Sequence, residues 1–137
     1  MKAKLLQRMA TSVPGTFDWR SATVEVYGKS RLMSEVHGGK LYHGSGAELP
    51  PGTILVPGIQ KNFRESSGEY VSVTSDPSRA KSWTEKSGAT QVHVYEVEPL
   101  YWIQSHRVQP WDSGKSFMLW EGICPRAVVV KEIEDIQ

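Results

Sequence analysis

A histidine followed by a glycine-rich turn is the feature of the sequence with the clearest potential for chemistry. Residues 40–46 read Lys-Leu-Tyr-His-Gly-Ser-Gly, in which Leu-Tyr is typical of a short strand and His43 stands at its end. Glycine has no Cβ, so the backbone at Gly44 and Gly46 can approach a ligand closely beside an imidazole. An ordinary surface histidine before a loop would fit the same residues, so other motifs must decide between the two interpretations.

Several familiar site motifs are imitated by the sequence without being completed. The dinucleotide fingerprint G-x-G-x-x-G would need glycine where Leu49 stands. A phosphate-binding P-loop ending at 114–116 would need glycine in place of Gln109 and a helix afterwards. The four histidines lack the spacing of zinc ligands, and no G-x-S-x-G elbow occurs in the sequence. Cys124 precedes a proline and is expected to be a core or surface thiol.

Composition indicates one small globular domain without a strong electrostatic preference. The 137 residues include five Trp, five Tyr and three Phe, enough for a core and for walls around a flat ligand. A net charge of +1 does not indicate a nucleic-acid or membrane partner. One cysteine excludes an internal disulfide, and no apolar run approaches the ~18 residues of a membrane span. The first ten residues lack an apolar core, so no signal peptide is expected.

The hydrophobic pattern predicts one sheet-dominated α+β domain without internal repeats. Strands are expected at 23–27, 41–42, 53–56 (at a sheet edge), 70–74, 90–97, 100–104, 117–123 and 127–133. The best helix is expected at 77–86, because Asp76 can cap its N-terminus and Pro77 fits its first turn. Further expectations are a short helix at 29–36, a helical turn within 3–9 of a loose arm, a lid or binding loop at 59–69 and a loop at 105–114 that carries Trp111.

Four motifs in order resemble the rifamycin ADP-ribosyltransferases. They are Leu-Tyr-His-Gly-Ser at 41–45, Leu-Val-Pro-Gly with Asn-Phe at 55–63, Tyr-Val-Ser-Val-Thr at 70–74 and Ala-Lys-Ser-Trp at 80–83. A histidine on one strand, a tyrosine on a second and a glutamate on a late strand also resemble the wider H-Y-E class, which includes diphtheria toxin and the poly(ADP-ribose) polymerases. Glu121 is the glutamate that fits, and the similarity covers about residues 40–133.

The resemblance implies a specific fold and domain organisation. The fold would be α+β, with two packed, mainly antiparallel sheets forming a split β-sandwich with a few short helices. Residues 40–137 would be the ADP-ribosyltransferase-like catalytic core. Residues 1–39 would be an N-terminal extension with one strand and one helix, within a single domain.

The resemblance also implies NAD as substrate, cleaved at its nicotinamide–ribose bond. Cleavage develops positive charge on the ribose, and the Glu121 carboxylate would stabilise it. Tyr70 and Trp83 would form an aromatic wall for nicotinamide. The alternatives are a solvated glutamate at Glu121 and ordinary core packing of the two aromatic residues.

The remaining implied contacts hold the dinucleotide in a bent pose. His43 would bond to the adenosine-side ribose, and the backbone of Gly44 to the nicotinamide carboxamide. Ser45 or Ser72 would assist. The implied catalytic set is therefore Glu121, His43 and Tyr70, and the implied NAD-binding set is His43, Gly44, Ser45, Tyr70, Ser72 and Trp83, with no metal.

The acceptor of the ADP-ribose stays open. Leu119 occupies a position where arginine-modifying relatives carry Glu or Gln, and leucine cannot accept a hydrogen bond from guanidinium. We expect a mono-ADP-ribosyltransferase of the toxin or effector kind that modifies a protein or nucleic acid in the cytoplasm, with an immunity (antitoxin) protein as a conceivable partner and no membrane association. The alternatives are transfer to a small rifamycin-like antibiotic, simple NAD hydrolysis, a non-catalytic module that binds NAD or ADP-ribose, and a purely structural or interaction domain.

Overall fold

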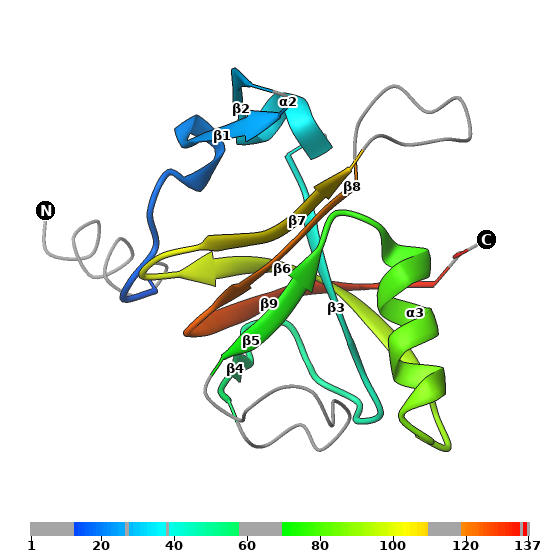
Figure 1. The fold of residues 1–137 in the computed structure, drawn as a ribbon. Coiled ribbons are helices and arrows are strands. Elements are labelled where there is room, and N and C mark those ends of the chain that lie inside the picture. Colours follow the sequence, from blue (N-terminus) through cyan, green and yellow to red (C-terminus); the bar gives the residue numbers. More distant parts are fainter. Residues whose placement is uncertain are drawn as a thin grey trace, which may run out of the picture.

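The computed structural model describes residues 13–26, 28–37, 39–57, 70–109, 119–134 and 136, with the side chains of 36–37 and 107–109 excepted. Figure 1 shows the arrangement of its elements. In chain order these are η1 (Trp19–Ser21), β1 (Thr23–Val26), β2 (Lys29–Leu32), α2 (Met33–His37), β3 (Leu41–Ser45), β4 (Ile54–Leu55), β5 (Val71–Thr74), α3 (Pro77–Lys86), β6 (His93–Leu100), β7 (Gln104–Gln109), β8 (Leu119–Cys124) and β9 (Arg126–Ile133).

The strands form one seven-stranded sheet and a separate hairpin. The sheet order is β4-β9-β6-β3-β5-β8-β7, the hairpin is β1-β2, and the described pairings are antiparallel. The prediction of a mainly antiparallel β structure with short helices is therefore confirmed. The expected two sheets are hydrogen-bonded into one, but the joint between β3 and β5 is narrow, since Tyr42↔Thr74 is the pair that links them.

Helix α3 begins and ends where its sequence predicts. The Asp76 side chain accepts a hydrogen bond from the backbone N–H of Ser78 (3.0 Å), and Pro77 occupies the first turn. Ala80 and Thr84 are fully buried against β3. Because Tyr42 and Gly44 alternate with Leu41 and His43, α3 covers the even-numbered face of β3, and the main hydrophobic core lies on the other face.

The segment before β3 contributes directly to that core. Trp19, Val26 and Met33 are buried together with core residues of the large sheet. Arg20 donates two hydrogen bonds to the Glu98 carboxylate (3.0 and 2.7 Å) and a third to the Gly39 carbonyl oxygen (2.8 Å). The indole N–H of Trp19 donates to the same carboxylate at 3.1 Å. Glu98 of β6 thus anchors the start of the described chain to the sheet.

The predicted helix at 29–36 is partly wrong. Residues 29–32 form β2, which pairs with β1 in the register Val26↔Lys29, and the helix begins only at Met33. Gly28 has φ 77°, a conformation that a tight hairpin turn requires and that glycine adopts without strain. The Lys-Ser-Arg-Leu sequence of β2 has little strand propensity, so the pairing with β1 decides its conformation.

Strand β6 is displaced from the predicted range 90–97 and continues through Pro99. Pro99 pairs with Ala127 of β9, while on the other side β3 begins at Leu41, which pairs with Val97. Beyond Val97 this edge of β6 has no β3 neighbour, so a residue without an N–H removes no bond to β3. Residues 104–109 form β7 against β8, where a strand at 100–104 and then a loop were expected.

Other expectations agree with the structure or lie outside it. β1, β3, β5, β8 and β9 overlap their predicted ranges, and β4 lies at a sheet edge as expected. The predicted helical turn within 3–9, the loop at 59–69 and Trp111 lie outside the described residues. None of the helices described is both long and apolar enough to cross a membrane.

Candidate functional site

Three cross-strand partners define one face of the sheet next to α3. Tyr42 of β3 pairs with Thr74 of β5, which pairs with Glu121 of β8. Residues directly opposite in an antiparallel ladder point to the same face, so these three share the face that α3 covers. The predicted glutamate therefore lies on the face that carries the helix.

Arg79 joins Glu121 to α3. Its Nε donates to Glu121 Oε2 at 2.6 Å, and its guanidinium carbon lies 5.8 Å from the centroid of the Trp83 ring. The Glu121 side chain is only 11% exposed, whereas that of Arg79 is 37% exposed. We refer to Arg79, Trp83 and Glu121 as the α3–β8 cluster. It brings together two residues predicted for the site, from positions 38 apart in the sequence.

Arg79 was not expected at the site. An arginine on a helix is normally a solvated charge, and nothing in its own neighbourhood in the sequence points to Glu121, 42 residues away. One local pattern could have indicated it. Arg79 and Trp83 are four residues apart on a predicted helix, a spacing that places a guanidinium beside an indole.

Gly44 packs against α3, and the reason that this position is glycine differs from the one expected. A Cβ at this position would stand 2.5 Å from the carbonyl oxygen of Ala80 and would collide with Thr84 Oγ1. The close approach of α3, rather than that of a ligand, therefore requires glycine here. The backbone of Gly44 still lies directly beneath the helix that carries Trp83.

Two hydroxyl groups accompany Glu121 on this face. Thr74 is fully buried, and its Oγ1 accepts a hydrogen bond from the backbone N–H of Asp76 at 3.2 Å. Burial raises the pKa of Tyr42, and the negative charges of Glu96 and Asp76 raise it further. Tyr42 consequently remains a protonated phenol, able to donate a hydrogen bond, throughout the neutral range.

His43 occupies the point where β3 and β5 separate. It is 2% exposed, and its Nδ1 lies 2.7 Å from the carbonyl oxygen of Ser72. A carbonyl oxygen only accepts, so Nδ1 carries the proton, and in the neutral imidazole Nε2 is then an acceptor. Ser72, which was expected to assist in NAD binding, thus contacts His43 through its backbone carbonyl oxygen.

His43 and Glu121 are not neighbours. Alternation along β3 assigns His43 to the face opposite Tyr42 and hence opposite Glu121. Glu121 also lies two strands from β3, which is about 10 Å between backbones at the usual strand spacing. A ligand that contacts both must pass the joint between β3 and β5.

Tyr70 lies away from the α3–β8 cluster. It precedes β5, four residues before Thr74, which is roughly 13 Å along an extended chain. Its ring is 38% exposed and packs edge-on against Trp102, with centroids 5.5 Å apart. The aromatic wall expected from Tyr70 and Trp83 together is therefore divided between two places.

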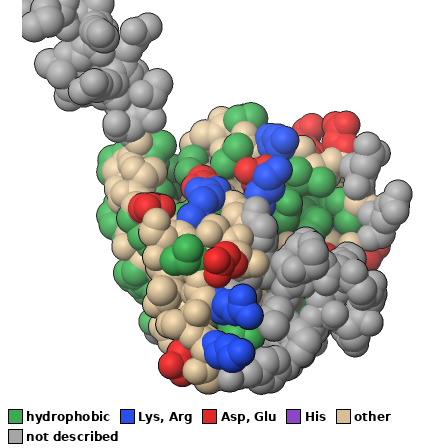
Figure 2. All heavy atoms as spheres, turned by 90° about the horizontal axis from the view of Figure 1, so that it is seen from above, with side chains coloured by type: hydrophobic (Ala, Val, Ile, Leu, Met, Phe, Trp, Pro, Cys, Tyr) green, Lys and Arg blue, Asp and Glu red, His purple; other side chains and the backbone are tan. Residues whose placement is uncertain are grey.

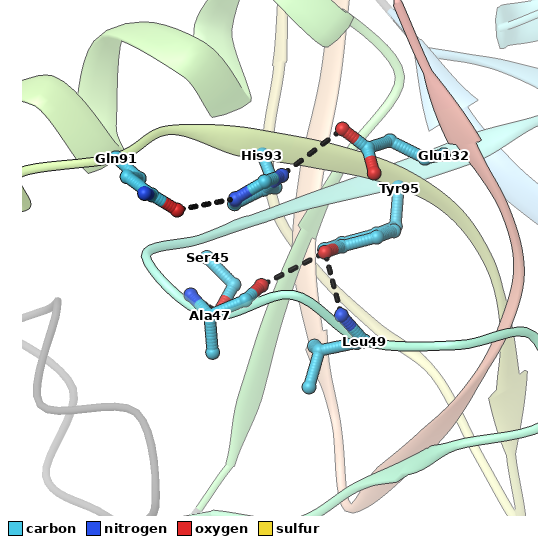
Figure 3. A network of polar contacts seen from close by, with 7 residues as sticks. All are labelled: Ser45, Ala47, Leu49, Gln91, His93, Tyr95 and Glu132. Atoms are coloured by element: carbon cyan, nitrogen blue, oxygen red, sulfur yellow. Dashed lines mark hydrogen bonds and ion pairs between the residues drawn. The ribbon is translucent and has the colours of Figure 1, made fainter.

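Ser45 belongs to a network that orders the turn after β3 (Figure 3). Its Oγ accepts from the backbone N–H of Ala47 at 3.1 Å. The buried Tyr95 hydroxyl donates to the Ala47 carbonyl oxygen and accepts from the N–H of Leu49, both at 2.8 Å. Burial raises the pKa of Tyr95, although the bond from Leu49 opposes this. Ser45 therefore has a local structural partner.

In the part of the chain that the structure describes, the other reactive groups form no second site. Cys124 is a buried thiol, and burial raises its pKa to about 12, so it is not a nucleophile at neutral pH. Within the described ranges, no three His, Cys, Asp or Glu residues are grouped to hold a metal. On the face in Figure 2, basic and acidic side chains are interspersed among uncharged ones, without a patch of one sign.

Comparisons with known proteins add no assignment. A search against models of protein families found no match, and a search of curated proteins found no similar sequence.

Proposed function

We propose that the chain is an NAD-dependent mono-ADP-ribosyltransferase, with the nicotinamide end of its substrate bound at the α3–β8 cluster. The observation that carries this proposal is the contact of Arg79 with both Glu121 and Trp83. A mostly buried carboxylate and an indole that both contact one arginine are the two groups that the reaction needs at the nicotinamide ribose. The indole offers a flat apolar surface, and the carboxylate offers negative charge where positive charge develops.

The strand arrangement also favours this function. The β3–β5 joint divides the sheet into β4-β9-β6-β3 and β5-β8-β7, held together by the pair Tyr42↔Thr74. A sheet that parts at this joint is compatible with the split β-sandwich of the ADP-ribosyltransferases. His43 stands at the joint and Glu121 on the second half, the order that the resemblance implies.

The reaction assigns each residue a distinct task. Glu121 stabilises the oxocarbenium-like ribose by bonding to its hydroxyl, and Trp83 stacks on nicotinamide. The backbone of Gly44 meets the carboxamide, and His43 Nε2 accepts from a ribose hydroxyl of the adenosine half. Because His43 is 2% exposed and lies on the core face of β3, this contact requires the residues that cover the imidazole to move when NAD binds. Tyr70 has no task in this arrangement, since its ring packs against Trp102.

The acceptor is proposed to be a protein or nucleic acid, not an arginine side chain. Leu119 is buried on the same strand and face as Glu121, two residues away. It offers no oxygen to bind a guanidinium acceptor. Incubation with labelled NAD and whole-cell extract distinguishes protein, nucleic acid and small-molecule acceptors by the fraction that the label follows.

Release of nicotinamide from NAD by the purified protein tests the function directly. We expect the wild type to release nicotinamide and Glu121→Gln to lose at least 100-fold in rate, about 2.7 kcal/mol of transition-state stabilisation, while its affinity for NAD changes little. Glu85→Gln, an exposed position on α3, is the matched control and should retain full activity. Thermal melts verify that both variants are folded.

The outcomes separate the alternatives. Nicotinamide release without transfer to any fraction would identify an NAD hydrolase. NAD binding without release would identify a binding module. No thermal shift with NAD and no release would refute the proposed function, because a ligand that binds the native state must stabilise it.

A further inference from the structure

Arg79 bonds to Glu121 with the side of its guanidinium group. The contact is made by Nε, at 2.6 Å from Oε2. The two terminal nitrogens, Nη1 and Nη2, carry four of the five N–H donors of the group. Among the residues that the structure describes, no acceptor is bonded to either Nη of Arg79. The carboxylate therefore occupies one edge of the guanidinium and leaves the terminal fork, Nη1 and Nη2, for another acceptor.

The different exposure of Arg79 and Glu121 indicates that the terminal fork of Arg79 points toward solvent. Glu121 is 11% exposed in its side chain and Arg79 37%, so the carboxylate lies on the protein side of the pair and the guanidinium on the solvent side. Trp83 flanks the same guanidinium. A planar fork held by a buried carboxylate on one edge and by an indole is preorganised to bind an oxyanion with two parallel hydrogen bonds.

We propose that Arg79 binds the diphosphate group of a nucleoside diphosphate ligand through Nη1 and Nη2. This inference rests on the proposed function for the identity of the ligand, NAD or ADP-ribose. In NAD, the first phosphate is attached to the 5′ oxygen of the nicotinamide ribose. A protein that places a carboxylate at that ribose therefore needs its phosphate-binding group only a few atoms away, which is where Arg79 lies relative to Glu121.

Diphosphate binding would also resolve an electrostatic conflict at Glu121. A guanidinium bonded to the carboxylate weakens the negative potential that the oxocarbenium-like ribose requires. A diphosphate on the opposite edge of the guanidinium offsets that positive charge without breaking the Arg79–Glu121 bond. Arg79 then positions Glu121, and the diphosphate of the substrate restores the negative electrostatic potential at the nicotinamide ribose.

Binding of ADP-ribose, ADP, inorganic pyrophosphate and nicotinamide, measured by calorimetry, tests the inference on the full chain. We expect Arg79→Gln to weaken ADP-ribose and ADP at least tenfold and to leave nicotinamide within twofold. Arg79→Lys keeps the charge but not the fork, so its loss should be intermediate. Lys86→Gln, at an exposed position of the same helix, is the matched control. Glu121→Gln should bind ADP at least as tightly as the wild type, because a negative charge near the phosphates is removed.

Salt provides a second readout. The affinity of the wild type for ADP should fall with rising ionic strength, and the residual affinity of Arg79→Gln should fall less. Equal ADP affinity in Arg79→Gln and the wild type would overturn the inference, as would equal weakening of nicotinamide and ADP, which would indicate general damage to the site.

The two proposals fail in different ways. Nicotinamide release by the wild type, together with undiminished ADP-ribose binding by Arg79→Gln, would refute the diphosphate site at Arg79 and leave the proposed transferase activity supported. Arg79-dependent ADP binding without nicotinamide release would support the diphosphate site and refute the proposed transferase activity. A wild type that binds none of the nucleotides would overturn both.

Discussion

Gly44 of β3 lies against the backbone of Ala80 in α3, so closely that a Cβ on Gly44 would stand 2.5 Å from the Ala80 carbonyl oxygen. Real Cβ atoms essentially never approach an oxygen to this distance, and a carbonyl in a helix cannot rotate away. The separation between α3 and the sheet, and hence the position of Trp83 and Arg79, depends on the missing side chain.

Gly44→Ala should therefore destabilise the protein by about 2–3 kcal/mol, the usual cost of overpacking a tight contact. The free energy of unfolding in urea measures this. Gly88→Ala is the comparison, since nothing lies within 4 Å of a Cβ there and the cost is the strain of its φ of 88°, about 1 kcal/mol. If Gly44→Ala were no more costly than Gly88→Ala, α3 would not be seated on β3 as described.

Tyr95→Phe should cost about 1–3 kcal/mol, because the Leu49 N–H and the Ala47 carbonyl oxygen both lose their partner in a partly buried region. Urea denaturation measures the change. Tyr101→Phe is the matched control, since Tyr101 is 57% exposed, and it should stay within about 0.5 kcal/mol of the wild type. Equal stability of the wild type and Tyr95→Phe would mean that the two hydrogen bonds of the Tyr95 hydroxyl, drawn in Figure 3, contribute nothing.

Glu98→Ala should weaken the attachment of the start of the described chain to β6. The substitution removes the hydrogen bonds from both terminal nitrogens of Arg20 and from the Trp19 indole. The Arg20–Glu98 ion pair is partly exposed, so we expect the free energy of unfolding to fall by about 1–2 kcal/mol, and by less at high salt. Rapid cleavage by trypsin at Arg20 should accompany it, whereas Glu85→Ala, an exposed change on α3, should alter neither property. Unchanged stability and protease resistance in Glu98→Ala would contradict this role.

Stability should fall as the pH rises above about 9. Folding raises the pKa of the Cys124 thiol from 9.0 to about 12, so between these values the unfolded thiol ionises while the native thiol stays protonated. The unfolded state then binds fewer protons, and the free energy of unfolding decreases by up to about 1.4 kcal/mol per pH unit. Tyr42 and Tyr95, whose pKa values burial also raises, add to the loss only above about pH 10.

Cys124→Ala isolates the contribution of the thiol. This variant should be less stable than the wild type at pH 7, because it loses buried volume, but its stability should change little between pH 9 and 10. Identical pH profiles of the variant and the wild type in this window would show that Cys124 does not titrate on unfolding.

Elements whose causes are local were predictable from the sequence. Helix α3 was predicted with its correct bounds because Asp76 and Pro77 act within the first turn that they begin. Strands β5 and β9 were predicted closely because their alternation or apolar run is contained within a few residues. The strand that carries His43 and the late strand that carries Glu121 also followed from their own motifs, but His43 was expected at the end of its strand and instead lies buried inside β3.

Features that depend on partners distant in the sequence became visible in the folded chain. Pairing with β1 makes residues 29–32 a strand against their propensity, and β6 continues through Pro99 because β3 begins only at Leu41, opposite Val97. The ion pair of Arg79 with Glu121 joins residues 42 apart, and the bond of His43 to Ser72 spans 29. The separation of Tyr70 from Glu121 follows from strand register. Register and helix packing are set by the whole core, whereas caps and alternation act within a few residues, which is why a single sequence reveals the second kind and not the first.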